Sequence, residues 1–346
     1  MPAENTIDTA HWYDALTFGI EGKAWTDTSQ FAQRLPDRVK DALRPELWDR
    51  AFTSAGFCVH FRTDAPRIWA RWRIAEWKGV PRGETLLRWC GLDLYARDDN
   101  GRWRWAGQGY PEYAQTDFEA LLTWSEMDRA PRDYKLYLPL GTACEALHLG
   151  APPDIELSPL PPRTDRPIVF YGTSIVHGGS ASRPGMPHPH ILGRRLDVPI
   201  VNLGFPGQGQ FDLPIAELMA EIDAAIYVVD CLPNCDTAKV LERTVPFVQV
   251  LREKRPGTPI VLVDEPDHPL AFFSTPRREE KMQKRAALRS RFRALVEEGV
   301  ENLHYIAGAE LFGDDGEATL DGVHPSDVGF MRQADAMEPV LRGLLR

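Results

Sequence analysis

The sequence predicts two domains, an antiparallel β-sandwich over residues 1–160 followed by an α/β domain over residues 161–346. Three observations support this prediction. The first part contains many short runs that alternate large apolar and polar residues, which is the period of half-buried strands. The second part alternates strand-like with helix-like stretches, the order that builds a parallel sheet with helices on both faces. A proline-rich segment separates the two parts.

The strand-like runs of the first part are bounded by turn residues such as Gly83, the cluster 98–101 and the segment 131–133. They cover 57–61, 68–72, 86–90, 103–105 and 134–138. Many short strands joined by polar turns are typical of an antiparallel sandwich. A short helix is expected within 36–50.

The segment 150–167 holds six prolines, at positions 152, 153, 159, 161, 162 and 167. Proline fixes φ and cannot donate a ladder hydrogen bond, so this segment is expected to be an extended linker or strap. After it, strand-like runs end near Tyr171, Leu203, Asp230, Asp264 and Ile306. Helices are predicted over 187–197, 212–222, 237–254, 276–299 and 325–345.

Composition excludes several classes of function. The chain has 346 residues, a formal net charge of −10 and 43% hydrophobic residues, as in soluble globular proteins. The locally basic stretch 276–293 alternates with Ala, Leu and Glu and is interpreted as the solvated face of a helix. No nucleic-acid or membrane partner is therefore expected, because no basic stripe and no apolar run of about 20 residues is present.

The five cysteines are odd in number and have no repeating spacing, which does not indicate a disulfide framework. Residues 1–22 lack the basic and apolar regions of a signal peptide. A cytoplasmic location is the simplest expectation, with secretion as the alternative if a leader was removed. The sequence does not predict the oligomeric state.

Polar and small residues follow the predicted parallel strands and precede the last predicted helix. These stretches are Gly172-Thr173-Ser174-Ile175, the glycine-rich 202–209, the segment 230–234, and Asp321-Gly322-Val323-His324. Because reactive groups gather at the carboxyl ends of parallel strands, all four stretches are expected to meet at one edge of the sheet.

Together these stretches contain the groups that acyl transfer requires. Ser174 is the predicted nucleophile, His324 the base that accepts its proton, and Asp321 the acid that orients the imidazole. The Ser174 amide, the Gly207 amide and the Asn234 side chain are predicted to form the oxyanion hole. Taken singly, each stretch could equally be a helix cap or a tight turn. Their joint occurrence in this order favours the catalytic interpretation.

These motifs resemble those of the SGNH/GDSL hydrolases. Gly172-Thr173-Ser174-Ile175 is similar to the nucleophile block, Gly207 and Asn234 match the second and third blocks, and 321–324 matches the DxxH block. Upstream, 91–95 (GLDLY) resembles the GxDLY signature of an N-terminal domain found in a subset of the family. The resemblance implies a flavodoxin-like, three-layer domain and a serine mechanism without metal or other cofactor. Two departures are Thr173, where the family has Asp, and Leu232-Pro233-Asn234-Cys235, where it has GxND.

Other residues near the predicted edge could contact a substrate. His177 and His188 flank the nucleophile loop and are interpreted as pocket wall, with helix capping as the alternative and metal ligation less favoured. Glu265 belongs to an acidic cluster at 264–268 that could accept hydrogen bonds from sugar or alcohol hydroxyls. Cys231 and Cys235 are interpreted as buried small residues rather than a redox pair.

Three functions stay open at this point. The first is a serine esterase acting on small acyl esters, such as acetylated sugars. The second is an acyltransferase that delivers the acyl group to an alcohol. The third is a non-catalytic carbohydrate-binding protein, in which tryptophans of the first domain would cover sugar faces, although core packing explains most of these residues. The expected partner is a small-molecule ester or acyl donor.

Overall fold

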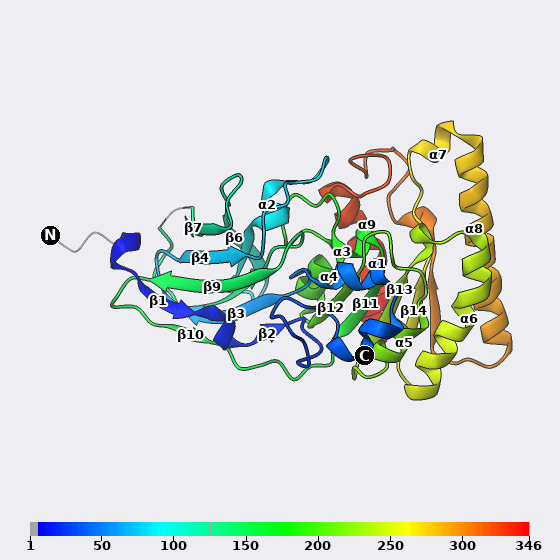
Figure 1. The fold of residues 1–346 in the computed structure, drawn as a ribbon, viewed down its shortest axis with the longest axis horizontal. Coiled ribbons are helices and arrows are strands. Elements are labelled where there is room, and N and C mark those ends of the chain that lie inside the picture. Colours follow the sequence, from blue (N-terminus) through cyan, green and yellow to red (C-terminus); the bar gives the residue numbers. More distant parts are fainter. Residues whose placement is uncertain (1–5, 125, 346) are drawn as a thin grey trace. The chain divides into compact units, whose positions relative to one another are not determined.

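The computed structural model describes residues 6–124 and 126–345, which form two compact units (Figure 1). Unit 1 comprises Met1–Arg34, Phe52–Thr164 and Ser182–Gly185, and unit 2 comprises Leu35–Ala51, Asp165–Ala181 and Met186–Arg346. Each unit therefore includes a segment from the other half of the sequence. The boundary predicted between residues 160 and 161 stays a prediction. No signal peptide is expected in residues 1–22. Residues 1–5 of this segment lie outside the residues that the structure describes.

Unit 1 contains two antiparallel sheets, which confirms the predicted β-sandwich domain. One sheet has the order β1 (His11–Asp14), β9 (Cys144–Ala151), β4 (Trp69–Ile74) and β7 (Asp117–Leu121). The other has the order β10 (Leu157–Pro159), β3 (Cys58–Thr63), β8 (Arg132–Tyr137), β5 (Leu92–Arg97) and β6 (Trp103–Gly109), with β2 (Ile20–Glu21) paired to β3. Val59 and Phe61 of β3 pack with Trp72 of β4 in the core, as alternate strand residues must.

The strand predicted over 86–90 is wrong, because Leu86–Cys90 forms the short helix α2. Thr85 caps its N-terminus by accepting a hydrogen bond from the Arg88 amide at 3.0 Å. The Gly91 amide donates to the Leu87 carbonyl at its other end. Five residues are too few for the alternation of side chains to distinguish a strand from a helical turn, and the threonine cap decides between them. Unit 1 also contains the 3₁₀ helices Ile7–Thr9 and Ala15–Phe18.

Unit 2 is built on a five-stranded sheet in which all neighbouring strands are parallel, as predicted. Its order is β12 (Ile200–Gly204), β11 (Ile168–Gly172), β13 (Ile226–Asp230), β14 (Ile260–Val263) and β15 (Leu303–Ile306). Counted along the chain this is 2-1-3-4-5, the flavodoxin-like order. Each strand ends within one residue of the position predicted from the sequence.

Helices cover both faces of this sheet (Figure 1). One layer contains α4 (His188–Leu196) and α9 (Asp327–Leu344), and the other contains α5 (Leu213–Met219), α6 (Thr237–Lys254) and α8 (Thr275–Glu297). Two neighbouring residues of β11 point to opposite faces of the sheet. Phe170 contacts His188 of α4 on one face, and Tyr171 stacks on Phe247 of α6 on the other. The shorter helices of unit 2 are α3 (Ser174–His177), α7 (Leu270–Phe273), η5 (Leu232–Asn234) and η6 (Gly308–Glu310).

The segment Leu35–Ala51 packs with unit 2 although it precedes most of the sandwich in sequence. It forms the 3₁₀ helix η3 (Asp37–Ala42), the short helix α1 (Pro45–Trp48) and η4 (Asp49–Ala51), in agreement with the short helix expected within 36–50.

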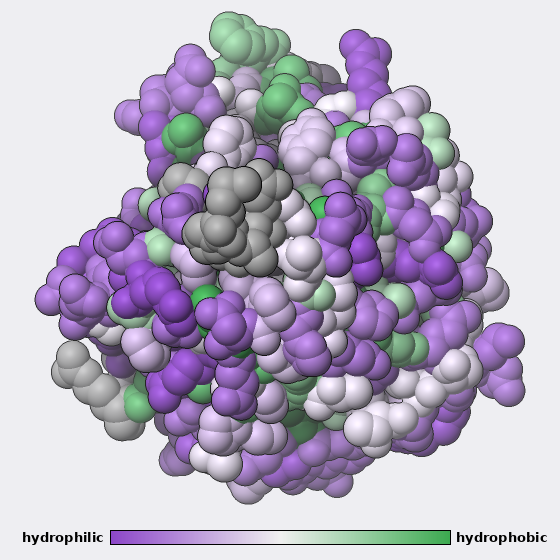
Figure 2. All heavy atoms as spheres, turned by 90° about the vertical axis from the view of Figure 1, so that its left-hand side faces the viewer, coloured by the Kyte–Doolittle hydropathy of each residue, from purple (hydrophilic) through white to green (hydrophobic). Residues whose placement is uncertain are grey.

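The surface drawn in Figure 2 is mainly hydrophilic, with smaller hydrophobic areas between the polar side chains. Tyr113 and Trp124 of unit 1 are among the large hydrophobic side chains that remain exposed. Within 6–124 and 126–345, no helix combines the length and apolar character that crossing a bilayer requires.

His188 is fully buried in the core of unit 2, and its ring lies between Phe170 and Phe330. Burial, together with the nearby His190, lowers the pKa of His188 to about 3. The unfolded chain takes up a proton at this imidazole below about pH 6.5, but the folded chain does not until about pH 3. Protonation in the unfolded state therefore lowers the free energy of unfolding as the pH falls through this range.

We predict that lowering the pH from about 7.5 to about 4.5 decreases the free energy of unfolding less in the His188→Leu variant than in the parent. The two decreases should differ by about 2–3 kcal/mol. Urea unfolding at both pH values measures this difference. His148→Leu, at an exposed position of unit 1, serves as the control and should keep the parent's pH dependence. Equal pH dependence in the His188→Leu variant and the parent would contradict the assignment of a neutral, buried His188.

Candidate active site

The carboxyl ends of β11, β12 and β13 lie side by side in the sheet of unit 2. Gly172, the last residue of β11, pairs with Gly204 of β12 on one side and Asp230 of β13 on the other. The loops that follow these strands carry Ser174, Gly207 and Asn234. The parallel register thus brings three of the predicted site segments to one edge.

Ser174 lies at the first position of α3, directly after a tight turn from β11. An added Cβ at Gly172 would meet the Asp230 carbonyl oxygen at 2.4 Å, so only glycine fits where β11 ends. Thr173 is the N-cap residue, and its hydroxyl accepts a hydrogen bond from the Ile175 amide at 3.2 Å. The threonine that replaces the family aspartate therefore performs the capping that an aspartate side chain can perform.

His324 and Asp321 come from the loop before α9. The Asp321 Oδ1 atom accepts hydrogen bonds from the amides of Val323 at 3.0 Å and His324 at 2.7 Å. Its Oδ2 atom lies 2.7 Å from His324 Nδ1. Partial burial raises the pKa of Asp321, but the hydrogen bonds from the His324 ring and from the two amides outweigh burial and lower it.

The imidazole of His324 connects Asp321 to Ser174. His324 Nε2 lies 2.9 Å from Ser174 Oγ. Because an ionised carboxylate can only accept, Nδ1 must donate to Asp321, and this leaves the Nε2 lone pair directed at the serine hydroxyl. The His324 side chain is 31% exposed, so solvent or a substrate can reach this pair.

Gly207 lies in a turn that follows β12. The Gln208 amide donates to the Phe205 carbonyl at 2.9 Å, with Pro206 and Gly207 at the two central positions. Gly207 has φ +74°, which a type II turn requires at this position and which glycine adopts without strain. The turn's hydrogen bond uses the Gln208 amide rather than the Gly207 amide.

Asn234 is the last residue of the 3₁₀ helix η5, which follows β13 after Cys231. The Asn234 amide donates to the Cys231 carbonyl and the Cys235 amide to the Leu232 carbonyl, each at 3.1 Å. Pro233 occupies the centre of this turn, where its fixed φ suits a helical conformation. The Leu-Pro-Asn sequence therefore provides a fixed turn where the family pattern has Gly-x-Asn.

A polar network that was not predicted from the sequence holds the loop after β12. Arg44 donates through Nε to Asp212 Oδ1 at 3.0 Å and through Nη2 to the Gln208 carbonyl at 3.1 Å. The buried Tyr171 hydroxyl donates to Asp212 Oδ2 at 2.8 Å and accepts from the Gln210 amide at 3.2 Å. Arg44 was missed because it lies 164 residues before Gln208 in the chain and has no motif around it.

The three residues predicted to contact substrate are all buried. His177 is 3% exposed and His188 lies in the core. Glu265 is 6% exposed and is paired with Lys284 at 2.7 Å and His268 at 3.4 Å. The substrate contacts predicted for these side chains stay predictions.

The acidic cluster at 264–268 follows β14, and Asp230 ends the neighbouring strand β13. Asp264 is fully buried and contacts Arg285 and Arg289 of α8. Burial, followed by the nearby Glu265 and Asp264 carboxylates, raises the pKa of Asp230 to about 7. Cys231 and Cys235 are both buried and unbridged, as interpreted from the sequence.

The profile of the GDSL-like lipase/acylhydrolase family matches residues 165–342, more than half of the chain. The chain belongs to this family. A second profile, for the N-terminus of SGNH-hydrolase-type esterases and named GxDLY, matches residues 10–157. The predicted resemblance is thereby confirmed for both parts of the chain. The search of curated proteins found no match.

Several solved structures have a similar fold. A protein from Bacteroides ovatus ATCC 8483, assigned as a GDSL-like lipase, is 32% identical, with 97% of this chain and 98% of that one covered and a TM-score of 0.90. The salicylyl-acyltransferase SsfX3 from a tetracycline biosynthetic pathway is 17% identical, with 98% and 99% covered and a TM-score of 0.77. A family two carbohydrate esterase from Clostridium thermocellum is 13% identical, with 84% and 92% covered and a TM-score of 0.56. The chain is therefore an SGNH-type enzyme.

We predict that Gly209→Ala destabilises the protein by roughly 1–3 kcal/mol, because the added methyl forces close-packed backbone apart. A Cβ at this position would lie 2.2 Å from the Gly172 carbonyl oxygen, at the end of β11. The control is Gly257→Ala, where a Cβ meets no atom within 4 Å, and its effect should stay within about 0.5 kcal/mol. Urea unfolding compares the two, and equal stabilities would contradict the packing described here.

Proposed function

We propose that the protein is a serine esterase that cleaves small acyl esters through an acyl-serine intermediate. The observation that carries the proposal is the hydrogen-bonded chain from Asp321 through His324 to Ser174, with distances of 2.7 Å and 2.9 Å. Family membership supports it, because the chain is an SGNH-type enzyme whose matched profile includes lipases and acylhydrolases.

In the first step, His324 Nε2 accepts the Ser174 hydroxyl proton as Oγ attacks the ester carbonyl. Asp321 stabilises the imidazolium that forms, through its contact with Nδ1. The resulting tetrahedral intermediate collapses when His324 returns the proton to the leaving alcohol. This leaves an acyl group on Ser174.

In the second step, water attacks the acyl-serine and His324 accepts a proton from it. The same chain of groups then releases the carboxylic acid and restores the serine hydroxyl. The Ser174 amide, the Gly207 amide and the Asn234 side chain are assigned as donors to the oxyanion in both steps. Their segments follow β11, β12 and β13, which are neighbours in the sheet.

Acetylated sugars are the proposed substrate class to examine first. The partly exposed imidazole is compatible with a small acyl group on a larger alcohol that stays in solvent. Solved structures with this fold include a family two carbohydrate esterase in complex with cellohexaose. A comparison of acetylated sugars with p-nitrophenyl esters of increasing chain length would establish the acyl preference.

Acyl transfer to an alcohol is the second candidate function. The structural similarity to a salicylyl-acyltransferase extends over nearly the whole chain and favours it. Both functions use the same acyl-serine, and they differ only in whether water or an alcohol attacks it. Carbohydrate binding without catalysis is the remaining alternative, and the hydrogen-bonded Ser174 and His324 argue against it.

We predict that Ser174→Ala and His324→Ala each abolish hydrolysis of p-nitrophenyl acetate while the protein still unfolds cooperatively. Asn234→Ala should lower kcat on the order of 10²-fold, because one oxyanion donor is removed. Ser290→Ala, at an exposed position of α8, is the control and should retain parental activity. Near-parental turnover in the Ser174→Ala or His324→Ala variant would contradict the assigned mechanism.

We further predict that water is the main acceptor of the acyl group. Product partition between free acid and new ester, measured at rising concentrations of an added alcohol or sugar, tests this directly. Esterase activity predicts that free acid dominates throughout. Predominant formation of the new ester at low acceptor concentration would instead establish the acyltransferase function.

A further inference from the structure

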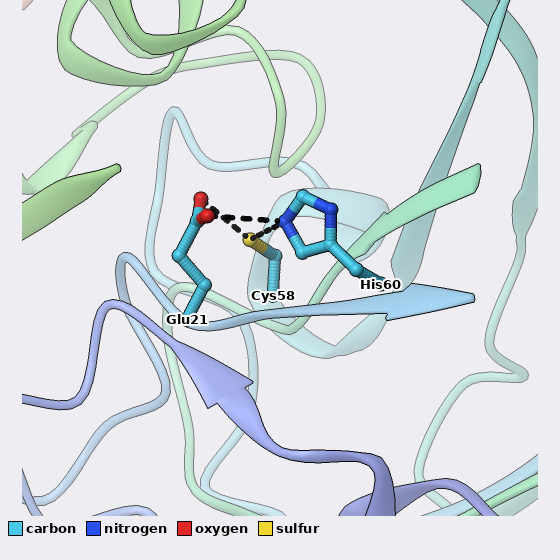
Figure 3. Close-up of side chains that lie close together, drawn as sticks. All are labelled: Glu21, Cys58 and His60. Carbon is cyan, nitrogen blue, oxygen red and sulfur yellow. Dashed lines mark hydrogen bonds and ion pairs between the residues drawn. The ribbon is translucent and has the colours of Figure 1, made fainter. Parts of the chain in front are cut away.

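Three side chains that are typical zinc ligands converge in unit 1: Glu21, Cys58 and His60 (Figure 3). Glu21 of β2 pairs directly with Cys58 of β3, and His60 follows two residues further along β3. Because alternate strand residues point to the same face, the pleat directs all three side chains to one side of the sheet. This is the side opposite to Val59 and Phe61, which pack in the sandwich core.

The potential ligand atoms lie close enough together to share one metal ion. One ligand atom from each residue lies within 4.8 Å of the other two. Cys58 Sγ lies 3.6 Å from His60 Nε2, and the two atoms approach different carboxylate oxygens, Cys58 Sγ at 3.5 Å from Glu21 Oε1 and His60 Nε2 at 3.3 Å from Glu21 Oε2. Bond lengths of about 2.0–2.3 Å to zinc place the ligand atoms of one tetrahedral site roughly 3.3–3.6 Å apart, so the sulfur and the nitrogen are already separated as zinc ligands would be.

The cluster is shielded from solvent. Cys58 is 1% exposed, and the side chains of Glu21 and His60 are 11% and 13% exposed. Glu21 Oε2 is buried, and His60 Nε2 lies 3.3 Å from it. The ring of Trp103 packs edge-on against His60 and helps to enclose the site. Buried charged groups in proteins are paired or bind metal ions, so this carboxylate is a suitable position for a cation.

Lys135 is the charged neighbour that such a cation would have to tolerate. It lies opposite His60 on β8, is 1% exposed, and its Nζ is 3.1 Å from Glu21 Oε1. This contact fixes the carboxylate, whose other oxygen faces His60. Burial, followed by the Glu21 carboxylate, raises the pKa of the Cys58 thiol well above its usual range, and the positive charges of Lys135 and Arg163 offset only part of this rise.

We propose that Glu21, Cys58 and His60 bind one zinc ion that fastens the two-residue strand β2 to β3. Cys58 Sγ, His60 Nε2 and a Glu21 carboxylate oxygen provide three ligands, and water completes the tetrahedron. Binding converts the Cys58 thiol to a thiolate and releases its proton to solvent, with no change in the oxidation state of zinc. A thiolate, an imidazole and a carboxylate form a ligand set suited to Zn²⁺.

Metal binding by the full-length protein tests this proposal. The protein is stripped with a chelator, incubated with Zn²⁺ or Co²⁺, dialysed, and assayed by elemental mass spectrometry and absorption spectroscopy. We expect one zinc per chain and a higher melting temperature with zinc. The cobalt form should show the intense visible bands of tetrahedral Co²⁺ together with a thiolate-to-cobalt charge-transfer band.

Variants identify the ligands. Cys58→Ser should remove the charge-transfer band, and His60→Gln should weaken zinc binding at least about tenfold. Cys144→Ser changes another buried cysteine of unit 1 and should retain the band. The measurement on the parental protein does not depend on whether a variant folds. If the parental protein holds no metal after dialysis, the proposal is wrong and the cluster is a hydrogen-bonded network around the Glu21–Lys135 pair. Metal binding unaffected in both the Cys58→Ser and His60→Gln variants would overturn it equally.

Discussion

The hydrogen bond between Ser174 and His324 is the interaction on which the account of this enzyme depends. It joins residues 150 positions apart in the chain, so it depends on the tertiary fold that brings the two segments together. The strand β11 delivers the serine to the sheet edge, and the loop before α9 delivers the imidazole. The capping of α3 by Thr173 and the two amides bound by Asp321 fix each partner locally.

Much of unit 2 could be predicted because its sequence signals are local. Four of the five strands are short apolar runs that stop at glycine or aspartate, and α6 was predicted with the bounds that it has, Thr237–Lys254. The serine, histidine and aspartate could be found because each stands in a short motif. By contrast, Arg44 braces the loop after β12 through contacts that depend only on tertiary folding, and no local pattern marks it. The prediction of a strand over 86–90 was wrong because of a local signal. The threonine cap at Thr85 favours a helix, and it outweighed an alternation of side chains that was only five residues long.

The GxDLY signature illustrates how a motif can be recognised before its physical role is known. Asp93 is fully buried and accepts hydrogen bonds from Arg183 Nη1 and the Gly185 amide, both at 2.7 Å, and from Trp105 Nε1 at 3.0 Å. Through these contacts the signature aspartate holds Ser182–Gly185, a segment that follows α3 in the chain and belongs to unit 1. The Glu21–Cys58–His60 cluster shows the reverse case. Its residue types are informative, but only the pairing of β2 with β3 brings them together.

Covalent labelling of the parental enzyme with a small organophosphonate ester, followed by peptide mass spectrometry, tests the central claim most directly. An activated serine should form one adduct on the peptide that contains Ser174, and His324→Ala should slow its formation strongly because the hydroxyl loses its base. This result would establish that the hydrogen bond between the two side chains activates the serine. An unlabelled Ser174 in folded protein, or labelling at the same rate without His324, would contradict the account.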